Sequence, residues 1–206
     1  MIFDLWETLI DWDPEAARRM NERIDEIAGF EFRERWHASP NRYTAPVREA
    51  LTGPGVPAEA MDDVCAARLE FVRHCLVPRA GAVETLRRLR GDGFGVGLIT
   101  VCSEDVETLW PESAFAGLFD AEIFSNAIGL SKPDPRIYLA CCGQLGVEPG
   151  EAVFVGDGAN DELEGARRVG LLPILIHKPG QDPIWPEVRT WTGPRVNSIP
   201  EVLEHL

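Results

Sequence analysis

Short apolar runs alternate along the chain with segments of helical spacing. Four of these runs are rich in β-branched or large apolar residues, as is typical of buried parallel strands. They are MIF at 1–3, VGLIT at 96–100, AVFV at 152–155 and LLPILI at 171–176, and AEIFS at 121–125 is a candidate fifth strand. Because strands and helices alternate, the pattern predicts a doubly wound α/β fold built on a parallel sheet.

Helical segments separate these strands and carry the usual end signals. The segment at 82–93 ends in glycine, and Ser103 is a candidate N-cap of the next helix. Helical spacing also covers 134–146 and 159–170. The tail at 178–206 combines prolines and tryptophans without a clear period. We expect irregular structure there, closed by a short C-terminal helix.

Residues 14–76 interrupt the alternation of strands and helices. Two amphipathic helical segments lie on either side of the turn-rich sequence TGPGVP. We interpret this block as an inserted helical cap, and we predict that 1–13 and 77–206 together form the core. A chain of 206 residues and 22.8 kDa agrees with one good core and a small inserted unit.

The composition narrows the classes of partner. The chain has 20 basic and 34 acidic residues, for a formal net charge of −14, which repels phosphate backbones, so we expect no nucleic-acid partner. The 5 cysteines form no C-x-x-C pair, as expected in a reducing cytoplasm. The sequence shows neither an apolar run of about 18 residues nor a signal-peptide pattern. We therefore expect a cytoplasmic protein with no membrane partner.

Polar residues follow the predicted strands at their carboxyl ends, where open α/β sheets bind ligands. Asp4 follows MIF, and Thr100 ends VGLIT. Asp157 follows AVFV, with Asp161 four residues further on, and Lys132 lies in GLSKPDP. An acid at the end of an apolar strand costs desolvation energy unless it is paired or bound to a cation. Two such acids with a third nearby indicate a site for a hard, oxygen-liganded ion such as Mg²⁺.

The start of the chain is unusual in one respect. Only three residues precede Asp4, whereas strands usually run for about five or six residues. This is consistent with a natural start upstream of Met1.

Taken in order, these residues resemble the four motifs of the haloacid dehalogenase superfamily of hydrolases. The motifs are FDLWETL around Asp4, the strand-end Thr100, SKPDPRIY with Lys132, and VGDGANDELEGA with Asp157. The resemblance spans almost the whole chain and includes a helical insertion after the first motif. It implies a Rossmann-like core and a hydrolase that acts on a small-molecule substrate as a monomer or homodimer.

The resemblance also implies a role for each matching position. Asp4 would be the nucleophile and would form a covalent aspartyl intermediate. Thr100 and Lys132 would hold the oxygens of the transferred group. The implied Mg²⁺ ligands are the carboxylates of Asp4, Asp157 and Asp161, the last directly or through water, and the carbonyl oxygen of Trp6.

Trp6 is the departure from the usual phosphatase pattern. Most phosphatases of this superfamily carry a second aspartate at this position, which protonates the leaving oxygen and then activates water. An indole does neither, so we expect the loss to matter most for alkyl leaving groups and least for acyl or aryl phosphates. Asp11 and Asp13 are possible substitutes.

The aromatic residue at this position is also similar to true 2-haloacid dehalogenases, which have tyrosine there. Those enzymes need no metal, and serine replaces the first acid of their last motif. This chain keeps Asp157, and a carboxylate buried beside Asp4 suits a site in which a divalent cation screens both. The residues therefore favour Mg²⁺ and phosphoryl chemistry over dehalogenation.

Two other functions stay open. In a metal-independent haloacid hydrolase, a cap arginine such as Arg33, Arg35 or Arg42 would bind the halide or carboxylate. In a binding or regulatory protein, the fold and the ion site would persist without turnover. The candidate site residues also have purely structural interpretations. Asp4 could be an ion-pair partner and Thr100 a β-branched strand terminator. Lys132 could be an ordinary exposed lysine, and Asp161 could be an acid that favours a helix N-terminus.

Overall fold

The structure is a computed structural model that describes residues 1–178 and 185–206, so part of the predicted irregular tail, 179–184, lies outside the described residues. The described strands form one parallel sheet in the order β3-β2-β1-β4-β5-β6. They are β1 (Ile2–Phe3), β2 (Gly97–Thr100), β3 (Ala121–Phe124), β4 (Val153–Gly156), β5 (Leu172–Ile176) and β6 (Arg195–Val196). The predicted doubly wound α/β fold is confirmed.

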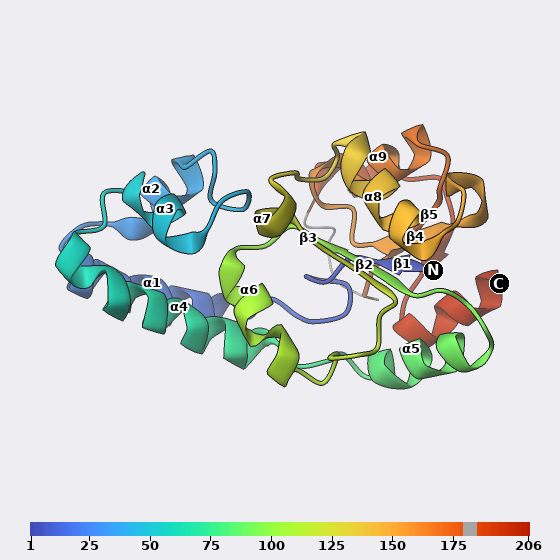
Figure 1. The fold of residues 1–206 in the computed structure, drawn as a ribbon, viewed down its shortest axis with the longest axis horizontal. Helices are drawn as coiled ribbons and strands as arrows, with labels where there is room; N and C mark the ends of the chain where they lie inside the picture. Colours follow the sequence, from blue (N-terminus) through green and yellow to red (C-terminus); the bar gives the residue numbers. More distant parts are fainter. Residues whose placement is uncertain (179–184) are drawn as a thin grey trace.

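Helices cover both faces of the sheet (Figure 1). One face carries α5 (Ala82–Gly91) and α6 (Glu104–Leu109), and the other carries α8 (Pro135–Leu145) and α9 (Glu162–Arg168). Neighbouring residues of a strand enter opposite apolar clusters: Phe3 packs on the α5 side, whereas Ile2 packs on the α8 side. This double burial explains why the strands read as continuous apolar runs.

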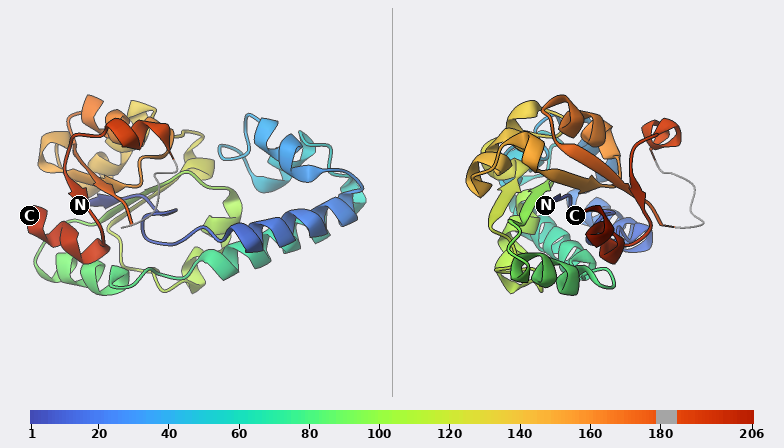
Figure 2. Two further views of the ribbon diagram at one scale, coloured as in Figure 1. Left: turned by 180° about the vertical axis from the view of Figure 1, so that it is seen from behind. Right: turned by 90° about the vertical axis from the view of Figure 1, so that its right-hand side faces the viewer.

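Residues 14–75 form a helical unit that extends to one side of the sheet (Figures 1 and 2). Its helices are α1 (Pro14–Ala28), α2 (Phe32–Ala38), α3 (Val47–Thr52) and α4 (Met61–Cys75). Asp13 caps α1 by accepting hydrogen bonds from the backbone N–H groups of Glu15 and Ala16. The far end of the unit has its own apolar cluster, which includes Ile24 and Phe32. We propose that this unit is the cap, and the boundaries at 14 and 76 stay a prediction.

Buried polar contacts join the helical unit to the core. Arg68 on α4 donates to Asp105 Oδ2 through Nε at 3.0 Å and Nη2 at 2.8 Å, and to Ser103 Oγ at 3.0 Å. The loop between α2 and α3 reaches α7 (Ser125–Ile128), where Ser125 Oγ donates to the Tyr43 carbonyl oxygen at 2.6 Å. The unit therefore lies beside the carboxyl ends of β2 and β3.

The remaining elements are short. The 3-10 helices are η1 (Ala58–Ala60), η2 (Trp110–Glu112), η3 (Pro149–Glu151), η4 (Ala159–Asp161), η5 (Pro186–Thr190) and η6 (Ile199–His205). The last of these is the expected C-terminal helix, in 3-10 form. Strand β6 pairs with β5 over two residues, which is too short to leave an alternating pattern in the sequence. None of the helices in the described ranges is long and apolar enough to span a bilayer.

Candidate active site

Three predicted site residues lie at the point in the parallel sheet where the order of the strands reverses. Strand β1 lies between β2 and β4, so their carboxyl ends are neighbours. Asp4 follows β1, Thr100 ends β2, and Asp157 follows β4. The backbone N–H of Asp4 donates to the Val155 carbonyl oxygen at 2.9 Å, which fixes the loop after β1 against β4.

Lys132 lies at the centre of this site and is buried. Its Nζ donates to Asp4 Oδ1 at 2.5 Å, to Glu162 Oε2 at 2.5 Å and to the Ile99 carbonyl oxygen at 3.3 Å. Burial works to lower the pKa of Lys132, but the negative charges of Asp4 and Glu162 outweigh it and raise the pKa. The lysine therefore carries its positive charge at neutral pH.

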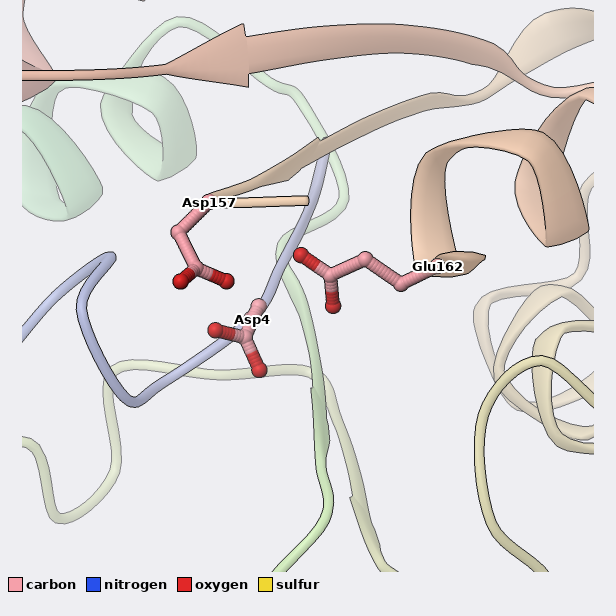
Figure 3. Close-up of side chains that lie close together, drawn as sticks. All are labelled: Asp4, Asp157 and Glu162. Atoms are coloured by element: carbon pink, nitrogen blue, oxygen red, sulfur yellow. The ribbon is translucent and has the colours of Figure 1, made fainter. Parts of the chain in front are cut away.

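Three carboxylates, those of Asp4, Asp157 and Glu162, face one another in Figure 3 and have oxygen atoms within 4.8 Å of one another. Burial, followed by the negative charge of Asp4, raises the pKa of Asp157 to about 6. Burial also raises the pKa of Glu162 well above its ordinary value, with further increases from Asp4 and Asp157. One lysine thus faces three acids, and the site has a surplus of negative charge.

Glu162 was not predicted, whereas Asp161 was. Asp161 is exposed and lies outside the three-carboxylate group, so the geometry gives no support to its predicted role as a metal ligand. Glu162 begins α9 and shares the buried face of that helix with Gly165 and Ala166. The spacing i, i+3, i+4 was the signal in the sequence that could have identified Glu162.

Glycines allow the buried glutamate to fit beneath the strand end. A Cβ at Gly156 would collide with Glu162 Oε1. The same oxygen accepts a hydrogen bond from the backbone N–H of Gly158 at 3.0 Å, and Gly158 has a φ of 90°. Positive φ is accessible to glycine without strain, so both glycines of the VGDG sequence serve the site.

Two buried threonine hydroxyl groups lack a partner in normal hydrogen-bond geometry among the described residues, those of Thr8 and Thr100. The Thr100 side chain also interacts with the Cys102 thiol. Buried hydroxyl groups are normally paired, so the Thr100 hydroxyl at the end of β2 is a candidate donor to a ligand at that strand end. This agrees with the predicted role of Thr100, which stays a prediction.

The Trp6 side chain packs against the helical unit. Its ring lies nearly parallel to that of Phe71 on α4, with centroids 6.3 Å apart, and meets the edge of Trp12 at 5.4 Å. Trp12 and Phe71 are also in edge contact, at 5.0 Å. The residue two positions after Asp4 therefore makes an aromatic contact with the proposed cap. The Trp6 carbonyl as a metal ligand stays a prediction.

Asp11 and Asp13, the two possible substitutes for the missing acid, are engaged elsewhere. Asp11 Oδ1 accepts from Arg79 Nε at 2.6 Å and from Lys178 Nζ at 2.5 Å. Burial works to raise the pKa of Asp11, but these hydrogen bonds outweigh it and lower the pKa. The α1 cap bond to Ala16, followed by a hydrogen bond with His74, lowers the pKa of Asp13. Neither group is suited to deliver a proton at neutral pH.

Two of the cap arginines considered for a haloacid contact groups within the helical unit. Arg35 lies over the Phe30 ring at 4.1 Å and donates to the Pro54 carbonyl oxygen at 3.2 Å. Arg42 donates to the carbonyl oxygens of His37 at 2.7 Å and Ser39 at 3.1 Å. Arg33 is exposed on α2.

The family follows from comparison with known proteins. A family model described as a haloacid dehalogenase-like hydrolase matches residues 1–170. The chain belongs to this family. As a haloacid dehalogenase-like hydrolase it is an enzyme, and the buried carboxylates and Lys132 lie at the sheet edge where this fold binds ligands.

Similar proteins include phosphatases and a haloacid dehalogenase. The hydrolase is 34% identical over 106 residues to glyceraldehyde 3-phosphate phosphatase of Methanopyrus kandleri, covering 50% of this chain and 45% of the relative. It is 32% identical over 103 residues to (S)-2-haloacid dehalogenase 4A of Burkholderia cepacia, with 50% and 44% covered. The chain therefore spans less than half the length of these two relatives. Phosphatase MT3486 of Mycobacterium tuberculosis is 30% identical over 195 residues, with 88% of each chain covered.

Similar solved structures likewise include a dehalogenase and an enzyme in complex with phosphate. A crystal structure of a dehalogenase is 26% identical, with a TM-score of 0.67, and the match covers 100% of this chain and 95% of that one. A HAD family enzyme from Bacteroides thetaiotaomicron, in complex with magnesium and inorganic phosphate, has a TM-score of 0.67 at 20% identity, covering 91% and 96%. The second likeness supports the fold alone.

Proposed function

We propose that this hydrolase is a Mg²⁺-dependent phosphatase that acts on a small phosphorylated metabolite through an aspartyl phosphate on Asp4. The observation that carries the proposal is the charge surplus at the strand ends, where three carboxylates face one lysine. Like charges this close raise one another's pKa and oppose folding, unless a cation is bound. A carboxylate-bearing haloacid would add a further negative charge.

The donor set suits magnesium. Mg²⁺ prefers hard oxygen ligands at about 2.1 Å, which places neighbouring ligand oxygens roughly 3–4 Å apart. The three carboxylates have oxygen atoms within 4.8 Å of one another. Asp4 and Asp157 would hold the ion together with the Trp6 carbonyl, while Glu162 already accepts hydrogen bonds from Lys132 and Gly158. When bound, the ion supplies charge neutralisation for the carboxylates and the phosphoryl oxygens.

The residues themselves would carry the reaction. A carboxylate oxygen of Asp4 forms a bond to phosphorus, and the bond from phosphorus to the leaving oxygen breaks, with its electron pair leaving on that oxygen. Lys132 and the buried Thr100 hydroxyl donate to the phosphoryl oxygens. Water then attacks phosphorus, which releases phosphate and restores Asp4. With Trp6 in place of an acid, leaving groups that need no proton, such as acyl or aryl oxygens, are favoured.

Beryllium fluoride, which mimics an aspartyl phosphate, tests this chemistry without a substrate. We expect it to raise the melting temperature only when Mg²⁺ is present, and we expect Asp4→Asn to lose the effect. Asp11→Asn is the matched control, because Asp11 is a nearby acid that lies outside the three-carboxylate group. Protection without Mg²⁺, or protection retained in Asp4→Asn, would contradict the proposal.

Calorimetry with Mg²⁺ tests which acids matter. We expect Asp157→Ala to abolish the binding heat and Asp161→Ala to retain it, because Asp157 lies in the carboxylate group and Asp161 does not. Equal heats from wild type and Asp157→Ala would refute the metal site. A screen of phosphorylated metabolites and of aryl and acyl phosphates, with and without Mg²⁺, would then identify the substrate class.

A metal-independent haloacid dehalogenase is the second candidate function. The aromatic residue at position 6 and the likeness to a solved dehalogenase favour it. Halide release from 2-haloacids in the presence of a chelator would establish this activity. A protein that binds Mg²⁺ but turns over no aryl phosphate and no haloacid would instead fit a binding or regulatory role.

A further inference from the structure

A hydrogen bond from the C-terminal part of the chain reaches the active-site acid Asp157. Trp185 Nε1 donates to Asp157 Oδ2 at 2.7 Å. The other oxygen, Oδ1, accepts from the backbone N–H of Ala159 at 3.1 Å. Each carboxylate oxygen therefore has an N–H donor from a different segment, so the orientation of the carboxylate is fixed on both sides.

The contact belongs to a packed surface. The 3-10 helix η5 begins directly after Trp185, and a Cβ at Gly158 would collide with Val188 Cγ2 of that helix. Val188 is buried, and Trp185 packs partly buried against the same apolar cluster on the α8 side of the sheet. Helix η5 therefore packs against the loop that carries Asp157, and Trp185 lies at the end that meets the carboxylate.

We propose that Trp185 is a positioning residue, whose indole N–H holds the Asp157 carboxylate toward Asp4 against the repulsion between the two acids. Asp157 and Asp4 lie in the three-carboxylate group, so an unrestrained Asp157 side chain would turn away from the other charges. The consequence for metal binding rests on the proposed function, because a pre-oriented carboxylate binds a cation with less ordering cost.

The chemical type of the donor matters. A lysine or arginine at this position would neutralise Asp157 and compete with a divalent cation. An indole is a neutral donor with a single N–H, so it orients the carboxylate and leaves its charge available. Hydrogen bonds to metal ligands from groups outside the first coordination sphere commonly change metal affinity by 10–100-fold.

The test uses Trp185→Phe, which keeps an aromatic ring and removes the donor. Trp191→Phe is the matched control, because Trp191 Nε1 donates to the Pro194 carbonyl oxygen at 3.0 Å and does not contact Asp157. We expect Trp185→Phe to weaken Mg²⁺ binding by about 10-fold or more, and Trp191→Phe to change it by less than about 2-fold. Equal Mg²⁺ affinity in wild type and Trp185→Phe would overturn the proposal.

An NMR measurement tests the contact in the metal-free protein. The indole N–H signal of Trp185 is assigned by its loss in Trp185→Phe, and we expect Asp157→Ala to shift this signal while leaving that of Trp191 in place. An unshifted Trp185 signal would overturn the positioning role. If Asp157→Ala shifts the Trp185 signal but the wild-type protein binds no Mg²⁺, the proposed metal dependence is refuted and the positioning of Asp157 by Trp185 still holds.

Discussion

Two clusters of charged side chains border the loop after β1, and they differ in charge balance. In the active-site cluster, Lys132 is the single cation among three carboxylates. In the second, which we call the hinge cluster, the cations are Arg79 and Lys178 and the anions are Glu7 and Asp11. With every group ionised, the active-site cluster has two negative charges in excess, whereas the hinge cluster is neutral.

The pKa shifts have opposite directions in the two clusters, with burial as the first cause in the active site and hydrogen bonds from cations as the lowering cause in the hinge cluster. The pKa of Asp157 rises in the active-site cluster, whereas that of Asp11 falls in the hinge cluster. Arg79 also donates to the carbonyl oxygens of Glu7 and Thr8, so the hinge cluster fixes the loop that follows the nucleophile. A balanced cluster leaves no charge uncompensated, whereas an unbalanced one costs stability until a ligand supplies the missing charge.

The largest expected effect is the loss of turnover in Asp4→Asn. An amide is too weak a nucleophile to form the covalent intermediate, so we expect aryl phosphate turnover to fall by at least about 10³-fold, or roughly 4 kcal/mol in barrier. The same change removes one charge from the unbalanced cluster, so the metal-free variant should melt at a higher temperature than wild type. Substantial turnover in Asp4→Asn would show that Asp4 is not the nucleophile. A lower melting temperature would show that the active-site cluster has no excess of negative charge.

The next effect concerns the balanced cluster. The Arg79 side chain is 9% exposed, and Arg79→Met would remove the donor to Glu7 Oε2 and to two loop carbonyls, while Glu7 Oε1 keeps the Trp12 N–H. We expect a loss of about 3 kcal/mol in the free energy of unfolding, measured in urea. Lys178→Met is the control: its partner Asp11 is half exposed, so the loss should stay below about 1 kcal/mol. Equal losses would show that the hinge cluster is only a surface feature.

The two clusters should change the free energy of unfolding in opposite directions as pH rises. The pKa of Asp157 is raised from 3.8 to about 6, so between these values the native state binds more protons than the unfolded state. In the metal-free protein, this contribution lowers the free energy of unfolding by about 2–3 kcal/mol as pH rises from about 4 to above 6. Asp11, with a lowered pKa, acts in the opposite direction and loses its contribution as pH falls below its unfolded value.

Urea unfolding with a chelator, measured from pH 4 to 7.5, checks this prediction. Asp157→Asn should reduce the fall, with the remainder coming from Glu162, whose pKa is also raised, and Asp11→Asn should leave the fall in place. Saturating Mg²⁺ should also remove the fall in wild type, because the bound ion keeps Asp157 ionised at little cost. A wild-type stability that rises steadily over this range without metal would refute the charge surplus.

The sequence predicted those parts of the molecule that depend on local pattern. The buried strands were predicted because helices cover both faces of the sheet, and Asp4, Thr100 and Asp157 because parallel strands place their carboxyl ends at one edge. Strand β6 was missed because two residues carry no period. Glu162 was missed because counting from Asp157 favoured its exposed neighbour over the buried face of α9.

The contacts made by tryptophans could not be predicted in the same way. The aromatic contact of Trp6 depends on where α4 returns beside the loop, 65 positions along the chain at Phe71. The hydrogen bond of Trp185 depends on the packing of η5 against the loop that carries Asp157. Both contacts join segments far apart in sequence, and neither has a local pattern that specifies it.

The smallest expected effect is that of Asp11→Asn on turnover. If Asp11 only balances Arg79 and Lys178, its removal should change turnover of an aryl phosphate by less than about 3-fold, since no proton transfer depends on it. A general acid would show a different signature: its loss costs about 10²–10⁴-fold and steepens the dependence of rate on leaving-group pKa. We expect wild type to show a steep dependence already, because Trp6 supplies no proton, and Asp11→Asn to show the same slope. A shallow slope in wild type that becomes steep in Asp11→Asn would show that Asp11 acts as the general acid. Trp6 would then be a packing residue whose aromatic contacts with Trp12 and Phe71 hold the proposed cap, with no consequence for proton transfer.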